Sequence, residues 1–320
     1  MVQTCSRMKL TLLRLASILL ASTALAAVAA PKKVLVVTVT TGFRHASIPT
    51  SEKVLAQLAA DSGGKFTVDF VQQPAGQPKA PARPKAGKAP VAAADETAFK
   101  DANAKWLLAV AEALKPLSPA NLKNYDAVVF LSTTGDLPLP DKQGFVDWIA
   151  AGHAFVGVHA AADTFHGFPA FIEMLGGEFA RHGPQVTVDC INQDPAHAAT
   201  KPLPAIWTVH DEIYQMKNFE RAKVRGLLSL DRLMLNAEDI AAKKATPGDY
   251  PVAWCKQFGK GRVFYTSLGH RDDVWDPAAP ESGKRQNAPE LSKLYQQHVL
   301  GGILWSLGLA PGDAKPQLAK

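Results

Sequence analysis

Residues 33–39 read KVLVVTV, and this apolar, β-branched run decides how the chain begins to fold. A continuous apolar stretch of this length is typical of a strand that is buried on both faces of a parallel sheet. Gly42 breaks the run, and Ser47 or Thr50 can cap a helix that continues to about Ala60. The sequence therefore opens with a strand followed by a helix, which is the repeating unit of a parallel α/β sheet.

The same alternation continues through the first half of the chain and predicts strands at 66–71, 125–131 and 153–158, with helices at 99–114 and 141–151. The second half is less regular, and its expected elements are strands at 185–191, 205–214, 224–230, 252–258 and 262–267 and a helix at 291–307. This order predicts a single-domain α/β fold over residues 31–310, with a doubly wound, mostly parallel sheet flanked by helices.

Two segments fall outside this pattern. Residues 1–30 combine a basic start, an apolar run and small residues, which predicts a secretory signal peptide cut after about Ala26 or Ala29. An uncleaved anchor is the alternative, although the run is shorter than the roughly 20 residues that cross a bilayer. Residues 74–94 are rich in Pro, Ala and Lys and predict a flexible surface insertion. We therefore expect an exported protein, periplasmic or extracellular, with no transmembrane span after cleavage.

The formal net charge of +6 does not indicate a nucleic-acid partner. Seven positive charges lie in the two segments just described: Arg7, Lys9, Arg14, Lys79, Arg83, Lys85 and Lys88. A nucleic-acid-binding face needs its basic residues on the fold itself, so we exclude that function. Cys5 leaves with the signal peptide, and the sequence does not decide whether Cys190 and Cys255 form a disulfide.

Ligands of open α/β sheets bind beyond the carboxyl ends of the strands, so we expect the chemistry there. Arg44 and His45 follow the first strand, and Thr133 and Thr134 follow the third. After the fourth strand, residues 157–163 read GVHAAAD, which has the form of a nucleophile elbow with a histidine, His159, at its centre. An imidazole at this position is suited to acid–base catalysis or to metal ligation.

Further polar groups follow the elbow. Asp163 can orient His159 or act as a second acid–base group, and His182 is expected to reach the same face. Asp211 and Glu212 stand beside Tyr214, and paired carboxylates divide acid and base roles or bind a cation. His270 follows a glycine at the tip of the last strand. Each residue type also has a purely structural use, as a buried imidazole, a helix-start carboxylate or a turn hydroxyl.

Taken together, these segments resemble the ThuA-like (trehalose utilisation) family over about residues 33–308. The matching segments are 41–45, 125–136, 155–163, 211–214, 253–255 and 261–270. The resemblance implies a class I glutamine amidotransferase-like, flavodoxin-like fold in which His159 stands where those enzymes carry cysteine. That argues against glutamine hydrolysis through a thiolate. The resemblance also implies a role in the metabolism of trehalose-type disaccharides or 3-keto-sugars.

We hypothesise an isomerase or hydrolase of a sugar or 3-keto-sugar that works by proton transfer beside a carbonyl. His159 and Asp163 would act as acid and base, and His45 and His270 would polarise oxygens. The expected substrate-binding residues are Arg44, Thr133, Thr134, Asp211, Glu212, Tyr214 and Trp254. His159→Ala should lower turnover roughly 10²–10⁴-fold with little change in the thermal midpoint.

Two alternatives remain open at this point. The first is a non-catalytic carbohydrate-binding protein, whose aromatic platforms would come from Trp254, Tyr214, Trp207 and Phe165. The second is a metal-assisted sugar hydrolase or isomerase, because histidines and carboxylates together can ligate a divalent ion. No other cofactor is expected, and the expected partner is a small-molecule sugar. The particular sugar, the metal ligands and the oligomeric state are not determined by the sequence.

Overall fold

The computed structural model describes Met1 and residues 30–81, 93–230, 250–279 and 284–317. The predicted signal peptide and the centre of the predicted insertion lie outside the described residues. From Pro31 onward the chain forms one compact unit. Within the described part, no helix is both long enough and apolar enough to cross a membrane.

A nine-stranded sheet forms the centre of this unit, in the order β2-β1-β3-β4-β11-β10-β9-β6-β7. Its parallel strands are β1 (Lys32–Val37), β2 (Phe66–Val71), β3 (Ala127–Leu131), β4 (Ala154–Val158) and β11 (Gly261–Thr266). Its antiparallel extension comprises β6 (Val186–Asn192), β7 (Ile206–Asp211), β9 (Arg225–Leu230) and β10 (Pro251–Phe258). The predicted doubly wound α/β fold is confirmed.

A separate two-stranded ladder pairs β5 (Glu178–His182) with β8 (Tyr214–Lys217). The sequence did not predict β5, because its residues, EFARH, contain no apolar run and most of its side chains are exposed. Its two strands carry His182 and Tyr214.

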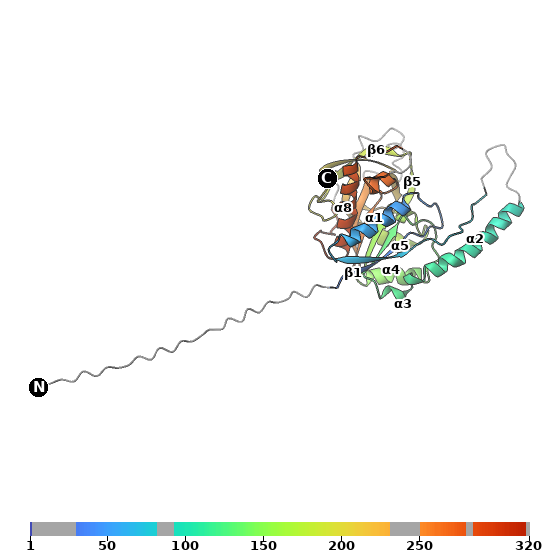
Figure 1. Ribbon diagram of the computed structural model, residues 1–320, viewed down its shortest axis with the longest axis horizontal. Helices are drawn as coiled ribbons and strands as arrows, with labels where there is room; N and C mark the ends of the chain where they lie inside the picture. The colour runs from blue at the N-terminus through green and yellow to red at the C-terminus, as the bar shows by residue number, and fades with distance from the viewer. Residues whose placement is uncertain (2–29, 82–92, 231–249, 280–283, 318–320) are drawn as a thin grey trace. The chain divides into compact units, whose positions relative to one another are not determined.

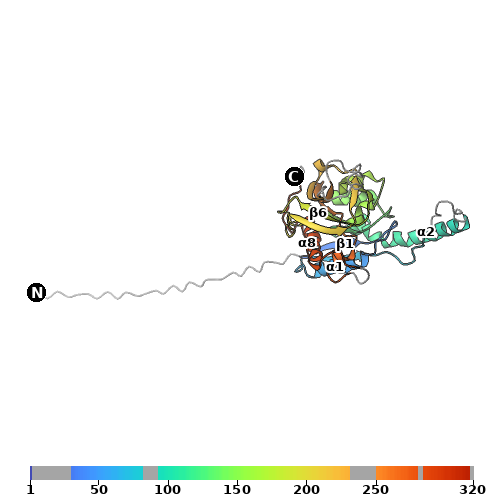
Figure 2. The ribbon, with the colours of Figure 1, turned by 90° about the horizontal axis from the view of Figure 1, so that it is seen from above.

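Helices cover both faces of the sheet (Figures 1 and 2). α1 (Ile48–Ala60), α7 (Asp272–Trp275) and α8 (Pro289–Ser306) share one apolar cluster with the sheet. α4 (Lys142–Ala150) and α5 (Pro169–Leu175) pack into a second cluster, together with the short α3 (Pro119–Leu122) and part of α2 (Ala93–Ala113). Short 3₁₀ turns are η1 (Lys115–Leu117), η2 (His159–Asp163) and η3 (Arg221–Lys223).

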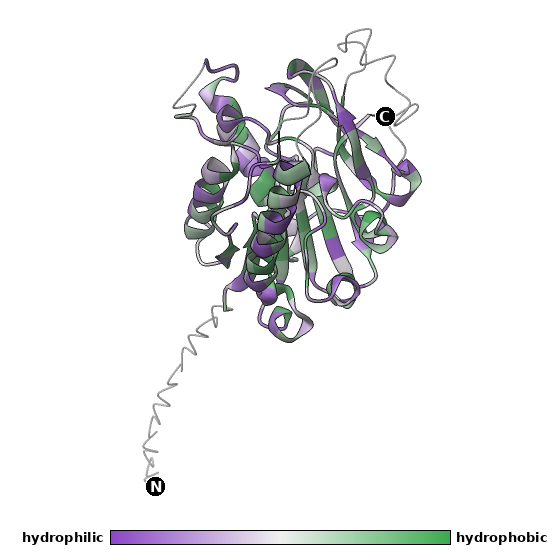
Figure 3. Cartoon of the chain, turned by 90° about the vertical axis from the view of Figure 1, so that its right-hand side faces the viewer, coloured by the Kyte–Doolittle hydropathy of each residue, from purple (hydrophilic) through white to green (hydrophobic). Residues whose placement is uncertain are grey.

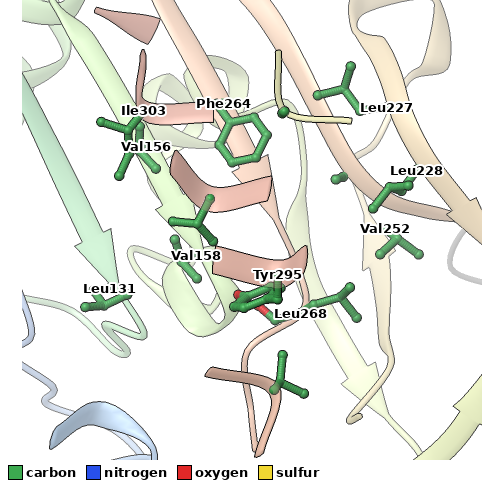
Figure 4. Close-up of a cluster of buried hydrophobic side chains, with 14 of the residues drawn as sticks. Leu131, Val156, Val158, Leu227, Leu228, Val252, Phe264, Leu268, Tyr295 and Ile303 are labelled. Carbon is green, nitrogen blue, oxygen red and sulfur yellow. The ribbon is translucent and has the colours of Figure 1, made fainter. Parts of the chain in front are cut away.

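The strand β1 shows why its sequence is continuously apolar. Val34 and Val36 enter the cluster beneath α1 and α8, whereas Leu35 and Val37 enter the cluster on the opposite face. Successive side chains of a strand point to opposite faces, so a strand covered on both sides needs apolar residues at every position. Figure 3 shows that the helices carry both apolar (green) and polar (purple) residues, and Figure 4 shows part of the first cluster, where Ile303 lies near Val156 and Tyr295 near Leu268.

The helix α2 begins at Ala93, six residues before the predicted start. It buries Trp106 and Val110, and most of its other side chains are exposed. Its first turns extend away from the sheet (Figures 1 and 2). The Trp106 indole donates a hydrogen bond of 3.3 Å to the carbonyl of Pro74, which ties this helix to the first residue of the predicted insertion.

Candidate active site

The turn after β4 has the form of the elbow that the sequence predicts. His159 has a positive φ of 50° and starts the 3₁₀ turn η2. A non-glycine residue in this region is strained, and such strain persists where the surrounding structure fixes it. A Cβ atom on Gly157 would lie 2.9 Å from Tyr265 Cδ2 and 3.2 Å from Leu175 Cδ1, so the strand fits there only with glycine. The elbow therefore places the His159 imidazole beyond the carboxyl end of β4.

Four side chains from distant parts of the chain meet at this edge of the sheet. His45 follows β1, His159 follows β4, Glu212 follows β7 and His270 follows β11; we call these four residues the histidine–glutamate cluster. One potential ligand atom from each lies within 4.8 Å of the others. His159, His45 and Glu212 are buried, and His270, at 20% side-chain exposure, is the member that solvent reaches most. The sequence predicted that the loops carrying these residues would converge, and the structure brings them together.

The ring and carboxylate contacts define how the cluster is arranged. The centroid of the His45 ring lies 4.6 Å from that of His159 and 5.2 Å from that of His270. Glu212 Oε2 lies 3.2 Å from His270 Nδ1 and 3.7 Å from His159 Nε2. The other carboxylate oxygen, Glu212 Oε1, lies 3.0 Å from His182 Nδ1. His182, which comes from β5, thus reaches this face as expected.

The orientation of His159 is fixed by partners on both nitrogens. Its Nδ1 donates a 2.7 Å hydrogen bond to the carbonyl of Ser267. Its Nε2 therefore carries the lone pair and accepts a 3.2 Å hydrogen bond from the Tyr214 hydroxyl. The Tyr265 hydroxyl donates to the carbonyl of His159 at 2.8 Å, which holds the elbow backbone.

Asp211 fixes the loop that carries His270 through a hydrogen bond to its backbone. Asp211 is fully buried, and its Oδ2 accepts a 2.7 Å hydrogen bond from the amide of Gly269. Burial raises the pKa of Asp211 to about 6, although this amide and His270 act in the opposite direction. The Trp275 indole donates to the Gly269 carbonyl at 2.9 Å. Asp211 is therefore a support for the loop, whereas its neighbour Glu212 joins the cluster.

Burial also decides the charge of the histidines. It lowers the pKa of His45 to about 4, with a further contribution from the nearby His270, and it lowers the pKa of His159 well below its usual value. Burial opposes the charged form of His270 too, but the Glu212 carboxylate outweighs it and the pKa of His270 is raised. At neutral pH the cluster accordingly presents the neutral imidazoles of His45 and His159 beside one carboxylate.

Three residues predicted to bind substrate are occupied within the protein. Thr133 Oγ1 and Thr164 Oγ1 share a 2.8 Å hydrogen bond, and Thr134 Oγ1 donates to the Phe43 carbonyl at 2.8 Å. Arg44 donates to the carbonyl of Thr38 at 2.8 Å. These hydrogen bonds close the loops after β1 and β3, and the substrate-binding role of the three residues stays a prediction.

The predicted aromatic contact from Trp254 is also absent from the site. Trp254 lies in β10 with no exposed surface, and its indole donates to the Leu175 carbonyl at 2.7 Å. Its position in an apolar strand buries it in the core. Cys190 and Cys255 are both buried and free in the structure, so they do not form the disulfide that export would permit.

Asp163, which the sequence predicts to orient His159, pairs with His166. Its Oδ1 lies 2.6 Å from His166 Nε2, while Glu178 Oε2 lies 2.6 Å from His166 Nδ1. The 3₁₀ turn η2 carries Asp163 toward this second histidine, because its tighter winding does not place positions 159 and 163 on one helical face. Asp163, His166 and Glu178 form an ion-paired triplet beside the cluster.

The triplet predicts a pH-dependent contribution of His166 to stability. Burial opposes its charge, but Asp163 and Glu178 raise the pKa of His166 above its unfolded value near 6.5. The contribution is then complete below about pH 6.5 and is lost as the pH rises through the folded pKa. Since the side chain is 40% exposed, we expect His166→Gln to lower the free energy of unfolding by at most about 1 kcal/mol at pH 6 and by less at pH 9. Urea unfolding at both pH values measures this difference, and an equal loss at both would contradict it.

Sequence reasoning missed Phe43. The residue follows Gly42 in the loop after β1, and it is 66% exposed, which is unusual for a large apolar side chain. Its ring centroid lies 4.9 Å from that of His45 in an edge-on arrangement. The one signal available was its place between Gly42 and Arg44 at a strand tip, which does not distinguish an exposed aromatic ring from a buried one.

The mostly parallel sheet and the elbow define an α/β protein with a histidine at the centre of the elbow. The chain belongs to the ThuA family, described as trehalose utilisation, which its sequence matches over residues 33–282. A comparison with curated proteins gives no match.

Two solved structures share the fold. A ThuA-like protein from Parabacteroides merdae is 19% identical, with a TM-score of 0.58 over 88% of this chain and 92% of its own. A ThuA-like protein from Bacteroides uniformis is also 19% identical, with a TM-score of 0.53 over 87% of this chain and 92% of its own. At this identity the likeness concerns the fold.

Proposed function

We propose that this protein is an enzyme that acts on a sugar or 3-keto-sugar by proton transfer beside a carbonyl group. The histidine–glutamate cluster is the observation that carries the proposal, because it gathers neutral imidazoles and a carboxylate at the edge of the sheet where α/β proteins bind ligands. Membership of a family described as trehalose utilisation supports a sugar as the substrate.

Such a reaction breaks a C–H bond next to the carbonyl, and its electron pair forms the C=C bond of an enediolate while the proton passes to a base. The proton then returns to the former carbonyl carbon, while the hydroxyl proton of the first carbon passes to the former carbonyl oxygen, so that an isomerisation consumes no co-reactant. The base must hold a lone pair, and the developing oxygen charge must meet a donor. Glu212 and the neutral imidazoles supply lone pairs, and the Tyr214 hydroxyl supplies a donor. Burial raises the pKa of Tyr214 well above 10, so that it keeps its proton.

This assignment changes two roles expected from the sequence. Glu212 replaces Asp163 as the carboxylate of the centre, since Asp163 pairs with His166. Tyr214 acts as a proton donor and not only as a contact for the substrate, because its hydroxyl lies 3.2 Å from His159 Nε2. His45 and His270 keep their place beside the reacting group.

The aromatic platforms expected of a carbohydrate-binding protein are not available among the residues first considered. Trp254, Trp207 and Phe165 are buried in the core, and a buried ring presents no face to a sugar. Phe43 is exposed beside His45, so we assign it as the ring against which the sugar packs.

Phe43→Ala is expected to weaken substrate binding with little change in chemistry. Loss of a stacked aromatic ring removes about 1–2 kcal/mol of apolar contact, which raises KM by roughly 5- to 30-fold. The ring is mostly exposed, so the melting temperature should stay near that of the wild type. Steady-state kinetics and thermal unfolding measure the two effects, with Leu108→Ala as a control for an exposed apolar side chain elsewhere. An unchanged KM would exclude Phe43 from the binding site.

The reaction is best identified with a panel of unoxidised disaccharides and their 3-keto forms. Mass spectrometry and NMR of the recovered sugars reveal isomerisation or hydrolysis directly. We expect conversion of at least one keto-sugar by the wild type and conversion roughly 10²–10⁴-fold slower by a His159 variant. Saturable binding with every sugar recovered unchanged would support a binding protein and overturn the enzymatic proposal.

We further propose that the protein is exported, from the signal-like composition of residues 1–30. Amino-terminal sequencing of the protein recovered from cell fractions tests this. A chain that begins near residue 27 or 30 outside the cytoplasm is expected, and an intact cytoplasmic chain would contradict it.

A further inference from the structure

We propose that His45, His159, Glu212 and His270 together bind one divalent transition-metal ion. The proposed function gives this ion its chemical use, but ion binding is a separate property that is measured on its own. Among the described residues, this is the group of histidines and carboxylates whose ligand atoms come close enough to share an ion.

The spacing of the ligand atoms is close to what such an ion needs. A metal held at about 2.1 Å from its nitrogen and oxygen ligands keeps neighbouring ligand atoms about 3.0–3.4 Å apart for angles of 90–110°. Glu212 Oε2 lies 3.2 Å from His270 Nδ1 and 3.7 Å from His159 Nε2, and the four ligand atoms all lie within 4.8 Å of one another. Side-chain adjustments that shorten the longer separations would bring these atoms into a coordination shell.

An unpaired nitrogen in the cluster is a second observation. Among the described residues of the cluster, His45 Nδ1 is buried without a hydrogen-bond partner, whereas His270 Nδ1 lies 3.2 Å from the Glu212 carboxylate. A buried polar atom left without a partner costs about 1–3 kcal/mol, so native proteins rarely keep one. An ion bound to His45 through this nitrogen would give it a partner.

The outer contacts of the cluster are those that metal ligands use. His159 donates its Nδ1 proton to the Ser267 carbonyl, which leaves the lone pair on Nε2. An ion bound to Nε2 would take the place of the hydrogen bond that this nitrogen accepts from the Tyr214 hydroxyl. His182 holds Glu212 Oε1 and leaves Oε2 directed at the other two histidines. Partners of this kind fix the tautomer and the orientation of a metal ligand.

The donor set indicates the class of metal. Three imidazoles and one carboxylate suit zinc and the other divalent first-row transition ions, whereas calcium and magnesium prefer sites built mainly from oxygen. Under this proposal His159 is a ligand and not a free base. The ion would then polarise the substrate oxygens, and Tyr214 is the proton donor that remains next to the ligand nitrogen.

The test uses the full purified chain after removal of metals with a chelator. Calorimetry with Zn²⁺, Mn²⁺, Co²⁺ and Ni²⁺ should show one ion per chain for at least one of them and weaker binding of Mg²⁺ and Ca²⁺. The bound ion should also raise the melting temperature, since it stabilises only the folded state. Glu212→Gln and His270→Ala should lower the affinity at least about tenfold, and His182→Ala about 10–100-fold as an outer partner.

His166→Ala is the matched control, because it removes an imidazole held between two carboxylates just outside the cluster. It should retain the wild-type affinity. Circular dichroism verifies that each variant is folded. If a histidine variant does not fold, the isosteric Glu212→Gln variant still tests the proposal. Absence of one-to-one binding, or equal affinity in the wild type and Glu212→Gln, overturns the proposal.

The outcomes separate this proposal from the sugar function. Tight ion binding without conversion of any sugar supports the metal site and removes the proposed reaction. Sugar conversion that survives complete chelation, but is lost in a His159 variant, supports the reaction and overturns the metal site.

Discussion

Replacement of His159 by asparagine is expected to lower turnover of the sugar substrate roughly 10²–10⁴-fold, whether the imidazole acts as a base or as a metal ligand. Asparagine is the informative substitution because it tolerates the positive φ of 50° at the elbow. Its amide can also donate to the Ser267 carbonyl, as Nδ1 does at 2.7 Å. The variant therefore keeps the elbow and removes the nitrogen that faces Glu212 and Tyr214.

Alanine at the same position would test two properties at once. His159 is completely buried, so alanine leaves a cavity and an unpaired Ser267 carbonyl, and we expect a stability loss of about 1–3 kcal/mol. The sequence alone had suggested little change in the thermal midpoint of His159→Ala. The burial of the ring, which no local pattern reveals, is the reason for the revision.

The measurement is the rate of sugar conversion by the wild type and the asparagine variant, with thermal unfolding of both. His298→Asn is the matched control, since His298 is also fully buried and its Nδ1 lies 2.8 Å from the carbonyl of Ala199. The control should lose stability and keep its turnover per folded molecule. If the His159 variant keeps more than about a tenth of the wild-type turnover, the ring has no part in the chemistry.

The central fold was predictable because its signals are local. The run from Val34 to Val37 is apolar at every position, as a strand covered on both faces requires. The glycine that permits the elbow and the small residues after His159 are equally visible in the sequence. The strand β5 was missed since its side chains are largely exposed, and its pairing with β8 depends on contacts more than thirty residues apart.

The sequence allowed the place of the site to be predicted from the sheet topology, but not the contacts of each side chain. Parallel strands bring their carboxyl ends to one edge, so His45, His159 and His270 could be expected to meet there. The sequence could not reveal that the hydroxyls of Thr133 and Thr134 are used by their own loops. A hydroxyl at a strand tip has the same pattern whether it binds a ligand or closes a turn.

Adjacent residues illustrate the same limit. Asp211 and Glu212 are both carboxylates at the end of β7, yet the side chains of neighbouring residues in an extended chain point to opposite sides. Asp211 turns inward to the Gly269 amide, and Glu212 turns to the histidines. Which of the two carboxylates contacts the histidines depends on the side of β7 on which the elbow lies. The folded sheet determines that side.

Tyr214→Phe is expected to reduce the catalytic constant about 10²-fold or more, with KM and ion affinity close to those of the wild type. The hydroxyl is the proton donor nearest to His159 Nε2, at 3.2 Å, and burial raises its pKa well above 10. Phenylalanine keeps the packing of the ring, whose centroid lies 4.3 Å from that of Phe179. The substitution thus removes one proton donor and little else.

Separate measurement of the catalytic constant and KM shows whether Tyr214 donates a proton or only positions the cluster. A residue that only positions the cluster would change ion affinity and melting temperature together with the rate, whereas a proton donor changes the rate alone. Tyr125→Phe is the control, because its hydroxyl bonds to the Asp69 carboxylate at 3.1 Å between β2 and the start of β3. Steady-state kinetics and calorimetry on both variants give the comparison. A Tyr214→Phe enzyme with normal turnover would assign the proton to another group.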